Sequence, residues 1–524
     1  MSEKLFDSGL SLHEKLARGI DKLADNVAAT YGPRGRNVIL HGKDKNPIIT
    51  KDGVTVAKFT NLEDPVENSA AQIIKQAAAA TALDAGDGTT TATILARACF
   101  KQARKYIMTG ASPVEIKKGM DKAVAAIVEK LLETARPIQS EEDITHIATI
   151  SANGDTAIGN LISKAVDLAG KDGAVSIEDA RSVDTSLDIV EGFRFDSGYF
   201  SPKFITNERK KTVNYDNPLI LVTDARISMV EDILPVLEVV AREGRPLIIV
   251  AEDVEGQALA ALIMNAIRGT MKVAAVKAPR YGEERRGILK DLAISMGAEF
   301  VSAENGLSLK NTKLENLGTA KKVEISKNWT TIMGGNGTPE LIEKQMDLLK
   351  DQIGATEELY ECERLQERIT RLASGIAIIR VGGVTEIEMM EKKYRIEDAL
   401  EAVNSAQQEG IVPGGGAVLI HATKNLHVEV DNRDQELGVL IVKEAIFAPI
   451  KQMASNAGQS PDIIVDKVSA CESQLEGWDF AKSEIVNMLE AGIVDPVKVT
   501  RCALQNAVSV ASTLITTSHA IVEI

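Results

Sequence analysis

The chain has 524 residues, 44% of them apolar and only 4% aromatic, and its formal net charge is −15. Because one hydrophobic core stops growing at about 250–300 residues, this length predicts about three domains, and the acidic balance argues against nucleic acid or an anionic membrane as the main partner. No apolar run approaches a membrane span and the N-terminus lacks signal or transit features, so we expect a cytoplasmic protein.

The first predicted element is an amphipathic helix over residues 8–30, where leucine and isoleucine recur at helical spacing. It ends at Tyr31-Gly-Pro-Arg-Gly-Arg-Asn37, because a Gly-Pro pair breaks a helix, and two arginines follow. By itself this turn is best interpreted as a plain connection into a strand at 38–40. The next glycine turn, Lys51-Asp-Gly53, lies between apolar segments and is typical of a hairpin.

The most informative stretch is Asp84-Ala-Gly-Asp-Gly-Thr-Thr-Thr91, after which helical periodicity resumes. A glycine turn that leads into a helix directs free backbone N–H groups and the positive end of the helix dipole towards an anion. Asp87 would repel that anion unless a cation such as Mg²⁺, which takes one or two carboxylates with phosphate oxygens, bridged the two. An ordinary turn with threonine N-caps is the alternative, and for so few residues it is favoured. The loop is not a Walker A sequence.

Further along, Ser112-Pro-Val-Glu115 predicts a capping box, and Pro137 marks a candidate domain junction. Between 190 and 375, short apolar strands alternate with helices at 229–242, 255–268 and 284–296, which predicts a parallel α/β unit inserted into a helical chain. Gly192 and Gly375 bracket this unit, and glycine permits the backbone rotations of a hinge.

Two helices of the inserted unit carry apolar faces, one with Leu234 and Leu237 and the other with Leu259, Ile263 and Met264. The favoured interpretation is that both faces belong to the core; a binding groove is the alternative, because the pattern cannot say which apolar side faces inward. Later, Gly414-Gly-Gly416 permits close backbone approach to a ligand, and a flexible loop is the alternative.

The four cysteines include no Cys-x-x-Cys pair and the six histidines are isolated. We therefore expect reduced thiols, and neither a zinc site nor histidine-based catalysis has a local signature. Any chemistry must rest on carboxylates, metals and backbone groups.

Taken together, these segments resemble the group I chaperonin family, the bacterial type, in a divergent form. The resemblance extends from about Gly9 to Thr517. It rests on an ordered series of motifs: Tyr31-Gly-Pro-Arg-Gly-Arg-Asn37, Thr50-Lys-Asp-Gly-Val54, Gly86-Asp-Gly-Thr-Thr-Thr-Ala-Thr93, Ile150-Ser-Ala-Asn153, Ala251-Glu-Asp-Val-Glu-Gly256, Lys272-Val-Ala-Ala-Val-Lys-Ala-Pro279, Arg395-Ile-Glu-Asp-Ala399 and Gly414-Gly-Gly416.

The resemblance implies a multidomain α and α/β fold. A mainly helical equatorial ATPase domain would comprise residues 1–135 and 409–524, and a small α/β intermediate domain residues 136–190 and 376–408. The inserted apical α/β domain would comprise residues 191–375. The implied hinges coincide with changes in composition at Pro137, Gly192, Gly375 and Gly410.

The implied function is that of an ATP-dependent molecular chaperone, an isomerase-type folding machine. It would bind unfolded or partly folded polypeptides on apolar apical surfaces and assist their folding in a chamber, driven by Mg-ATP hydrolysis. The chamber would be a homo-oligomeric ring of about seven subunits, single or double, with a co-chaperonin lid. Neither nucleic acid nor a membrane would be a partner.

By the same resemblance, Asp398 orients the attacking water and Asp52 assists. Asp87 holds Mg²⁺, and K⁺ lies near Thr30, Lys51 and Thr90. The other implied site residues follow. The nucleotide site comprises Thr30, Tyr31, Gly32, Pro33, Lys51, Asp87, Gly88, Thr89, Thr90, Thr91, Gly415, Asp479 and Asp495, and the polypeptide and co-chaperonin site comprises Tyr199, Phe204, Leu234, Leu237, Leu259, Ile263 and Met264.

Several positions depart from the family pattern. Lys203 stands where an apolar substrate contact is usual, and Asp479 where an asparagine is typical. Ser197 replaces an arginine that pairs between subunits with the residue matched by Glu386, and a Gly-Gly-Met tail is absent from this sequence. Two other classes therefore stay open: an ordinary ATP-using enzyme, and a passive holdase, against which the three retained aspartates argue.

Overall fold

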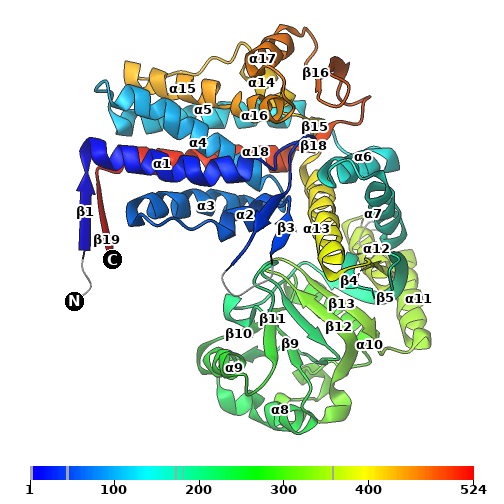
Figure 1. Ribbon diagram of the computed structural model, residues 1–524. Helices are drawn as coiled ribbons and strands as arrows, with labels where there is room; N and C mark the ends of the chain where they lie inside the picture. The colour runs from blue at the N-terminus through cyan, green and yellow to red at the C-terminus, as the bar shows by residue number, and fades with distance from the viewer. Residues whose placement is uncertain are drawn as a thin grey trace. The chain divides into compact units, whose positions relative to one another are not determined.

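The computed structural model describes residues 4–42, 47–170, 174–180, 182–356, 359–373 and 375–523, and its contacts divide the chain into two compact units (Figure 1). Unit 1 comprises Met1–Ser163, Arg181–Asp184 and Val381–Ile524, and unit 2 comprises Lys164–Ala180 and Thr185–Arg380. Each unit is assembled from segments far apart in the sequence, as expected for one domain inserted into another.

Unit 1 is built on a bundle of long helices. The C-terminal helix α18 packs against α3, α4 and α5, and α1 packs against α3 and α4. Alanine, valine, leucine and isoleucine dominate the buried faces, which confirms the predicted helical character. The helices are α1 (Gly9–Ala28), α2 (Gly53–Phe59), α3 (Pro65–Ala85), α4 (Thr89–Ile107), α5 (Pro113–Thr134), α6 (Glu141–Ser151), α7 (Thr156–Ala169, whose last residues belong to unit 2), α13 (Glu386–Glu409), α14 (Ala417–Thr423), α15 (Arg433–Ala445), α16 (Ala448–Asn456), α17 (Pro461–Ala470) and α18 (Val497–Ile515).

The described strands of unit 1 form separate antiparallel pairs. β1 (Lys4–Ser8) pairs with β19 (His519–Glu523), and β2 (Val38–Leu40) with β3 (Ile48–Thr50). β15 (Ile411–Pro413) pairs with β18 (Val494–Pro496), and β16 (Glu476–Asp479) with β17 (Glu484–Asn487). Such two-stranded ribbons are marginally stable by themselves, so the helices must support them.

The hairpin predicted around Lys51-Asp-Gly53 is wrong. β3 ends at Thr50, and Asp52 becomes the N-cap of α2, where its carboxylate accepts hydrogen bonds from the N–H groups of Val54 (2.9 Å) and Thr55 (3.2 Å). A carboxylate that satisfies the first free N–H groups of a helix stabilises that helix start. The same turn residues thus lead into a helix and not into a second strand.

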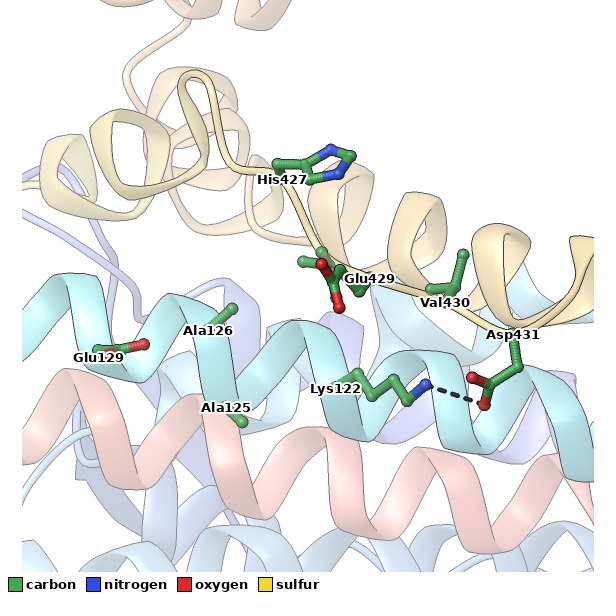
Figure 2. A pocket seen from close by; sticks show the side chains of 9 residues that line it. Lys122, Ala125, Ala126, Glu129, His427, Glu429, Val430 and Asp431 are labelled. Atoms are coloured by element: carbon green, nitrogen blue, oxygen red, sulfur yellow. Dashed lines mark hydrogen bonds and ion pairs between the residues drawn. The ribbon is translucent and has the colours of Figure 1, made fainter.

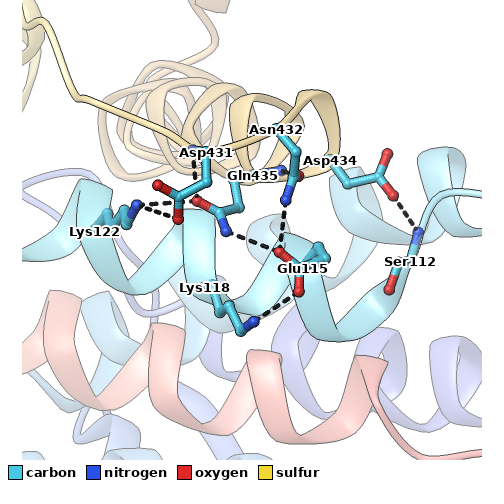
Figure 3. A network of polar contacts seen from close by, with 8 residues as sticks. All are labelled: Ser112, Glu115, Lys118, Lys122, Asp431, Asn432, Asp434 and Gln435. Atoms are coloured by element: carbon cyan, nitrogen blue, oxygen red, sulfur yellow. Dashed lines mark hydrogen bonds and ion pairs between the residues drawn. The ribbon is translucent and has the colours of Figure 1, made fainter.

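The predicted capping box at Ser112 is also wrong, although α5 does begin there. Ser112 makes no side-chain cap, and the Glu115 carboxylate accepts hydrogen bonds from Asn432 and Gln435 (both 2.8 Å) and from Lys118 (2.7 Å) (Figure 3). These donors, Lys118 foremost, lower the pKa of Glu115 to about 2. Glu115 therefore bonds to Asn432 and Gln435 instead of to the backbone N–H of Ser112. These bonds hold α5 against α15.

Unit 2 confirms the predicted α/β character. Its described part holds a nine-stranded sheet of order β11-β9-β7-β12-β13-β5-β14-β4, with β6 paired to β12. β7, β9 and β11 are parallel and almost wholly buried, as expected for strands covered on both faces. The strands are β4 (Ala174–Asp179), β5 (Ser186–Phe195), β6 (Val213–Asp216), β7 (Leu219–Val222), β8 (Arg226–Ile227), β9 (Leu247–Ala251), β10 (Asp253–Val254), β11 (Val273–Lys277), β12 (Gly318–Ile325), β13 (Thr330–Gly335) and β14 (Gly375–Val381); the helices are α8 (Val230–Glu243), α9 (Gly256–Arg268), α10 (Gly282–Met296), α11 (Pro339–Ala355) and α12 (Leu359–Ala373).

The four residues predicted as hinges occupy defined positions. Gly192 lies in β5 where this strand changes its partner from β14 to β13, and a Cβ there would overlap with the Ile376 side chain. Gly375 opens β14 and pairs with Glu191. Pro137 follows a backbone bridge between Arg136 and Ile411, and Gly410 ends α13. The hinge role of these residues stays a prediction.

Within the described residues, no helix combines the length and the apolarity needed to cross a membrane.

Candidate functional site

The loop between α3 and α4 is shaped by two glycines. α3 ends because Gly86 takes a left-handed conformation (φ +74°), and Gly88 (φ +84°) is the N-cap of α4. A Cβ at Gly86 would overlap with Glu401, and one at Gly88 would lie 2.6 Å from Val499 Cγ1. No side chain caps the first turn of α4, so the threonine-cap interpretation favoured from the sequence is wrong. The start of α4 keeps the free N–H groups that an anion requires.

Three aspartates gather at this loop. The Asp87 carboxylate accepts hydrogen bonds from the Gly88 N–H (2.5 Å) and the Ser151 hydroxyl (3.0 Å). Burial raises the pKa of Asp87, and the nearby charge of Asp52 raises it further. Burial, followed by the charge of Asp87, raises the pKa of Asp495 to about 6. Within the described chain, neither Asp87 nor Asp495 has a basic ion-pair partner, so a cation would relieve their repulsion.

The start of α2 brings Asp52 to the same place. Gly53 is so close to α4 that a Cβ there would overlap with Thr90 Oγ1. The Asp52 carboxylate also accepts a hydrogen bond from the Thr55 hydroxyl (2.5 Å), which together with the two backbone bonds restricts its orientation. The packing of α2 against α4 therefore places Asp52 close to Thr90. Their roles at a shared site stay predictions.

The end of α1 forms another wall. The Thr30 hydroxyl donates to the Val27 carbonyl (2.8 Å), and the hydroxyl groups of Tyr31 and Thr91 share a hydrogen bond (3.0 Å). Lys51 Nζ donates to the Gly32 carbonyl (3.3 Å). Burial lowers the pKa of Lys51, and the charge of Arg395 lowers it further. The predicted residues of the Thr30–Pro33 turn, Lys51 and Thr91 thus lie together.

Helix α13 presents one face to this loop. The Ser405 hydroxyl donates to the Ala85 carbonyl (2.7 Å), and Glu401 packs against Gly86. Arg395 is near enough to Lys51 for its charge to lower the pKa of Lys51. Asp398 lies three residues from both Arg395 and Glu401, and residues three or four apart share a helix face. Asp398 is therefore on the side of α13 that faces the loop.

The glycine turn after β15 completes the arrangement. β15 and β18 align Val412 with Asp495, and the Gly415 N–H donates a hydrogen bond to the Asp495 carboxylate. The turn is therefore a defined structure in which Gly414 donates to the Ile493 carbonyl (2.9 Å). Asp479 is buried at the end of β16, where its Oδ1 accepts from the N–H groups of Ala481 (2.7 Å) and Lys482 (3.2 Å). That carboxylate oxygen is occupied in shaping the β16–β17 turn.

Ser151 is a site residue that sequence reasoning did not assign. It lies at the end of α6 and supplies the hydroxyl bonded to Asp87. Its position in the Ile150–Asn153 motif was the available signal, but the motif alone gave no partner.

The described residues contain no group of three His, Cys, Asp or Glu side chains arranged to hold a metal. Mg²⁺ does not require such a group, because it typically takes one or two carboxylates and completes its shell with water and phosphate oxygens. Asp87 lies near Asp52 and Asp495, and its pKa is raised, so its carboxylate is suited to bind Mg²⁺.

The seven predicted polypeptide-binding residues differ in exposure. Leu234 on α8 and Met264 on α9 are 44% and 46% exposed, whereas Tyr199, Leu259 and Ile263 are half-buried. Phe204 and Leu237 are only 1% and 7% exposed and belong to the core of unit 2. Ile267, which was not predicted, is 60% exposed on α9. We call Leu234, Met264 and Ile267 the α8–α9 face.

A hollow of about 870 Å³ lies elsewhere in unit 1, between α5 and the extended segment 427–431 (Figure 2). Lys122, Ala125 and Ala126 form one side and His427 and Glu429 the other. None of the predicted site residues lines it. The candidate site is instead formed by Asp52, Asp87 and Asp495, which we call the carboxylate cluster.

Comparison with known proteins adds two findings. The model of the TCP-1/cpn60 chaperonin family matches residues 23–524. Among solved structures, the chain is similar to the chaperonin gp146 from the bacteriophage EL 2 (Pseudomonas aeruginosa), crystallised in the presence of ATP-BeFx. The identity is 20%, 99% of each chain is covered and the TM-score is 0.66, which shows a shared fold.

Proposed function

The chain belongs to the TCP-1/cpn60 chaperonin family, and from this premise we propose that it is an ATP-dependent chaperone that binds non-native polypeptides and assists their folding. The observation that carries the proposal is the convergence of Asp52, Asp87 and Asp495 beside the free helix start at Gly88. Free N–H groups suit phosphate, and the carboxylates of Asp87 and Asp495, which have no basic ion-pair partner within the described chain, suit the cation that accompanies it.

Each residue then has a distinct role in hydrolysis. The N–H groups at the start of α4 bind phosphate oxygens, and Asp87 would hold Mg²⁺. Bound there, Mg²⁺ supplies the positive charge that neutralises the phosphates in the transition state. Asp398 orients the attacking water and accepts its proton, and Asp52 assists. K⁺, if bound beside Thr30, Lys51 and Thr90, would supply further positive charge.

The Ser151 hydroxyl has a preparatory role in this scheme. It holds one oxygen of Asp87 while the Gly88 N–H holds the other. The carboxylate is therefore oriented before the cation arrives, which reduces the reorganisation needed on binding.

Polypeptide capture is assigned to the α8–α9 face. Exposed leucine, methionine and isoleucine side chains provide apolar area without directional bonds, and methionine adapts to partners of different shape. A co-chaperonin lid would use the same face. Lys203, which is exposed close to buried Phe204, would make capture more selective.

Assembly into a ring is supported by the isolated ribbons of unit 1. Phe6 on β1 and Ile521 on β19 are exposed, as are Ile39 on β2 and Ile49 on β3. Exposed apolar residues on paired strands with free edges invite pairing with a second copy. We propose a group I type ring of about seven subunits, single or double, in the cytoplasm.

The hydrolysis assignment is tested with Asp398→Ala. We expect ATP turnover to fall about 100-fold or more, the usual range for loss of a general base, while nucleotide binding persists. Asp351→Ala, an exposed aspartate on α11, is the matched control. Turnover that survives in Asp398→Ala contradicts the assignment of the base.

Capture is tested with Leu234→Ser, measured as the binding of a chemically denatured protein. We expect capture to weaken while ATP turnover stays at the parent level. Leu341→Ser on α11 is the control, because Leu341 is exposed but lies outside the α8–α9 face. Equal capture by the parent protein and Leu234→Ser contradicts this surface.

The chamber is tested by the mass in solution, with and without Mg-ATP. A particle of about seven or fourteen subunits supports the ring. A monomer or dimer throughout would leave no chamber and would favour an ordinary ATP-using enzyme.

A further inference from the structure

A second hollow of unit 1, of about 390 Å³, lies beside the Tyr31–Asn37 loop. Ligand sites commonly have volumes of about 300–1,000 Å³, so this hollow is large enough for a small molecule. We call it the arginine pocket, and it is lined by Arg34, Arg36, Asn456, Ala457, Gln459, Phe480 and Ser483.

Two arginines from one loop dominate the pocket. Arg34 and Arg36 are both exposed, and throughout the described chain neither guanidinium has a hydrogen-bond or ion-pair partner. In a protein of net charge −15, two adjacent guanidinium groups without carboxylates are unusual. The planar fork of arginine matches phosphate oxygens with paired hydrogen bonds, so the two side chains favour a phosphate-bearing anion.

Ser483, which also lines the pocket, offers a further donor. Ser483 Oγ accepts a hydrogen bond from Gln459 Nε2 (2.8 Å), which leaves the Ser483 hydroxyl proton free to donate. Gln459 is itself held, because its Oε1 accepts from Trp478 Nε1 (2.8 Å). Phe480, a buried residue, also lines the pocket. The pocket therefore combines donors from the Tyr31–Asn37 loop and from Ser483 with an apolar lining residue.

Asn456 connects the pocket to the loop that carries Thr30 and Tyr31. Its Nδ2 donates to the carbonyls of Ala28 and Tyr31 (both 2.9 Å), and its Oδ1 accepts from Gln452 (3.0 Å). All its hydrogen-bonding groups are engaged, so it transmits displacement rather than binding a ligand. A shift of Arg34 or Asn456 would reach the Tyr31–Pro33 turn directly.

We propose that the arginine pocket is a second anion site, separate from the carboxylate cluster, which binds a polyanion with linked phosphate groups such as pyrophosphate. Arg34 and Arg36 bind its oxygens, and the Ser483 hydroxyl donates a further hydrogen bond to it. The site itself does not depend on the proposed function. Its effect on nucleotide affinity, through Asn456 and Tyr31, rests on that function.

The test uses Trp478 as a reporter, because its indole is bonded to Gln459 in the pocket wall. Of the two tryptophans in the chain, Trp329 is replaced (Trp329→Phe) so that fluorescence reports on the pocket alone. The full-length protein is saturated with Mg-ADP at buffered free Mg²⁺, and pyrophosphate is then titrated. We expect a saturable change in fluorescence that weakens at high ionic strength.

Arg34→Ala with Arg36→Ala should weaken pyrophosphate binding by about tenfold or more, since hydrogen bonds to charged groups are the strong ones. Arg34→Lys with Arg36→Lys keeps both positive charges but loses the planar guanidinium groups. This variant should bind pyrophosphate with intermediate affinity. The control is Arg242→Ala with Arg268→Ala, two exposed arginines of unit 2 whose loss changes net charge equally. Isothermal titration calorimetry of the same proteins provides a second measurement.

Two outcomes overturn the proposal. The first is a pyrophosphate titration of the Arg34 and Arg36 double alanine variant that matches the parent. The second is no titration in the parent together with a changed assembly mass in the variant, which would assign the arginines to a contact between copies. Asp398→Ala protein should titrate like the parent, so failure of the hydrolysis assignment and failure of this site are distinguishable. If further ADP competes with pyrophosphate, the pocket accepts nucleotide phosphates; if not, it takes the free polyanion.

Discussion

The carboxylate cluster of unit 1 and the α8–α9 face of unit 2 are built in opposite ways. At the cluster, backbone atoms and short side chains approach so closely that Gly53, Gly86 and Gly88 have no room for a methyl group. At the α8–α9 face, long apolar side chains extend from helices with solvent around them. A close-packed site such as the carboxylate cluster suits a ligand of one geometry, whereas an exposed apolar surface such as the α8–α9 face suits partners of many shapes.

This difference predicts how strongly a single substitution affects each region. In a close-packed site, one added carbon displaces several functional groups, so single substitutions should have large effects. On an exposed apolar face, each side chain contributes a share of contact area, so single substitutions should have small and roughly additive effects. Substitutions in unit 2, at the cluster and on the α8–α9 face test this contrast.

The contrast requires that unit 2, which carries the α8–α9 face, be rigid, and Asp291 tests the stability of this unit. Asp291 is 1% exposed, and its carboxylate accepts bonds from Arg368 Nε (2.7 Å), Arg368 Nη2 (2.8 Å) and Gln345 (2.9 Å), which join α10, α12 and α11. Asp291→Ala leaves Arg368 without its counter-charge and should destabilise unit 2 by about 3–5 kcal/mol. Urea unfolding followed by Trp329 fluorescence in a Trp478→Phe background reports on unit 2, and unfolding followed by Trp478 fluorescence in a Trp329→Phe background reports on unit 1.

The control for this experiment is Asp291→Leu combined with Arg368→Met, which removes both charges and should regain much of the stability. If Asp291→Ala unfolds at the parent urea concentration, unit 2 does not depend on this ion pair.

Gly53→Ala tests the close packing of the cluster. The added Cβ overlaps with Thr90 Oγ1, so Thr90 or the start of α2 must move, at a cost of about 1–3 kcal/mol. We expect nucleotide affinity to fall about tenfold, measured by calorimetry. Gly354→Ala on α11, where no atom lies within 4 Å of the added Cβ, should leave affinity unchanged. Parent-like affinity in Gly53→Ala would break the contrast.

The pH dependence of stability tests the crowding of carboxylates. The pKa of Asp495, raised to about 6, means that the folded state holds this proton more tightly than the unfolded state does. The free energy of unfolding should therefore fall as pH rises from about 4 to 6 and then level off. Asp495→Asn removes this component, so above pH 6 the variant should be more stable than the parent by the order of 1–2 kcal/mol.

Thermal or urea unfolding between pH 4.5 and 7.5 compares the parent, Asp495→Asn and the exposed-site control Asp351→Asn. Saturating Mg-ADP should reduce the difference, because the cation offsets the repulsion. A constant difference between parent and variant across this pH range would mean that Asp495 is not crowded.

The smallest effect is expected at Ile267. Ile267→Ser should weaken polypeptide capture about three- to tenfold, the share of one partly exposed apolar side chain, without changing stability. Leu237→Ser is the matched comparison: as a buried residue it should lower the free energy of unfolding by about 2–4 kcal/mol, and any loss of capture should follow from unfolding. Equal stability of the two variants would contradict the division of α8 and α9 into buried and exposed sides.

Two failures of prediction have a common cause in contacts between distant segments. Ser112 and Glu115 have the local spacing of a capping box, but Asn432 and Gln435 on α15 take the glutamate. Likewise, Leu234 and Leu237 lie on the same apolar stripe, and packing in unit 2 buries one and exposes the other. In both cases a residue far away in the sequence decided between two locally equivalent arrangements.

The helical character of unit 1, the α/β alternation of unit 2 and the positions of the glycine turns follow from the sequence alone, because periodicity and backbone conformation are local properties. The sequence motifs also indicated the family and most residues around the loop at Asp87. Only the tertiary structure decided which carboxylates crowd together, that Ser151 holds Asp87, that Arg34 and Arg36 share a pocket with Ser483, and which apolar residues face solvent. Those facts depend on segments that approach one another only when the chain is packed, and pairwise distance between remote residues has no local signal in a single sequence.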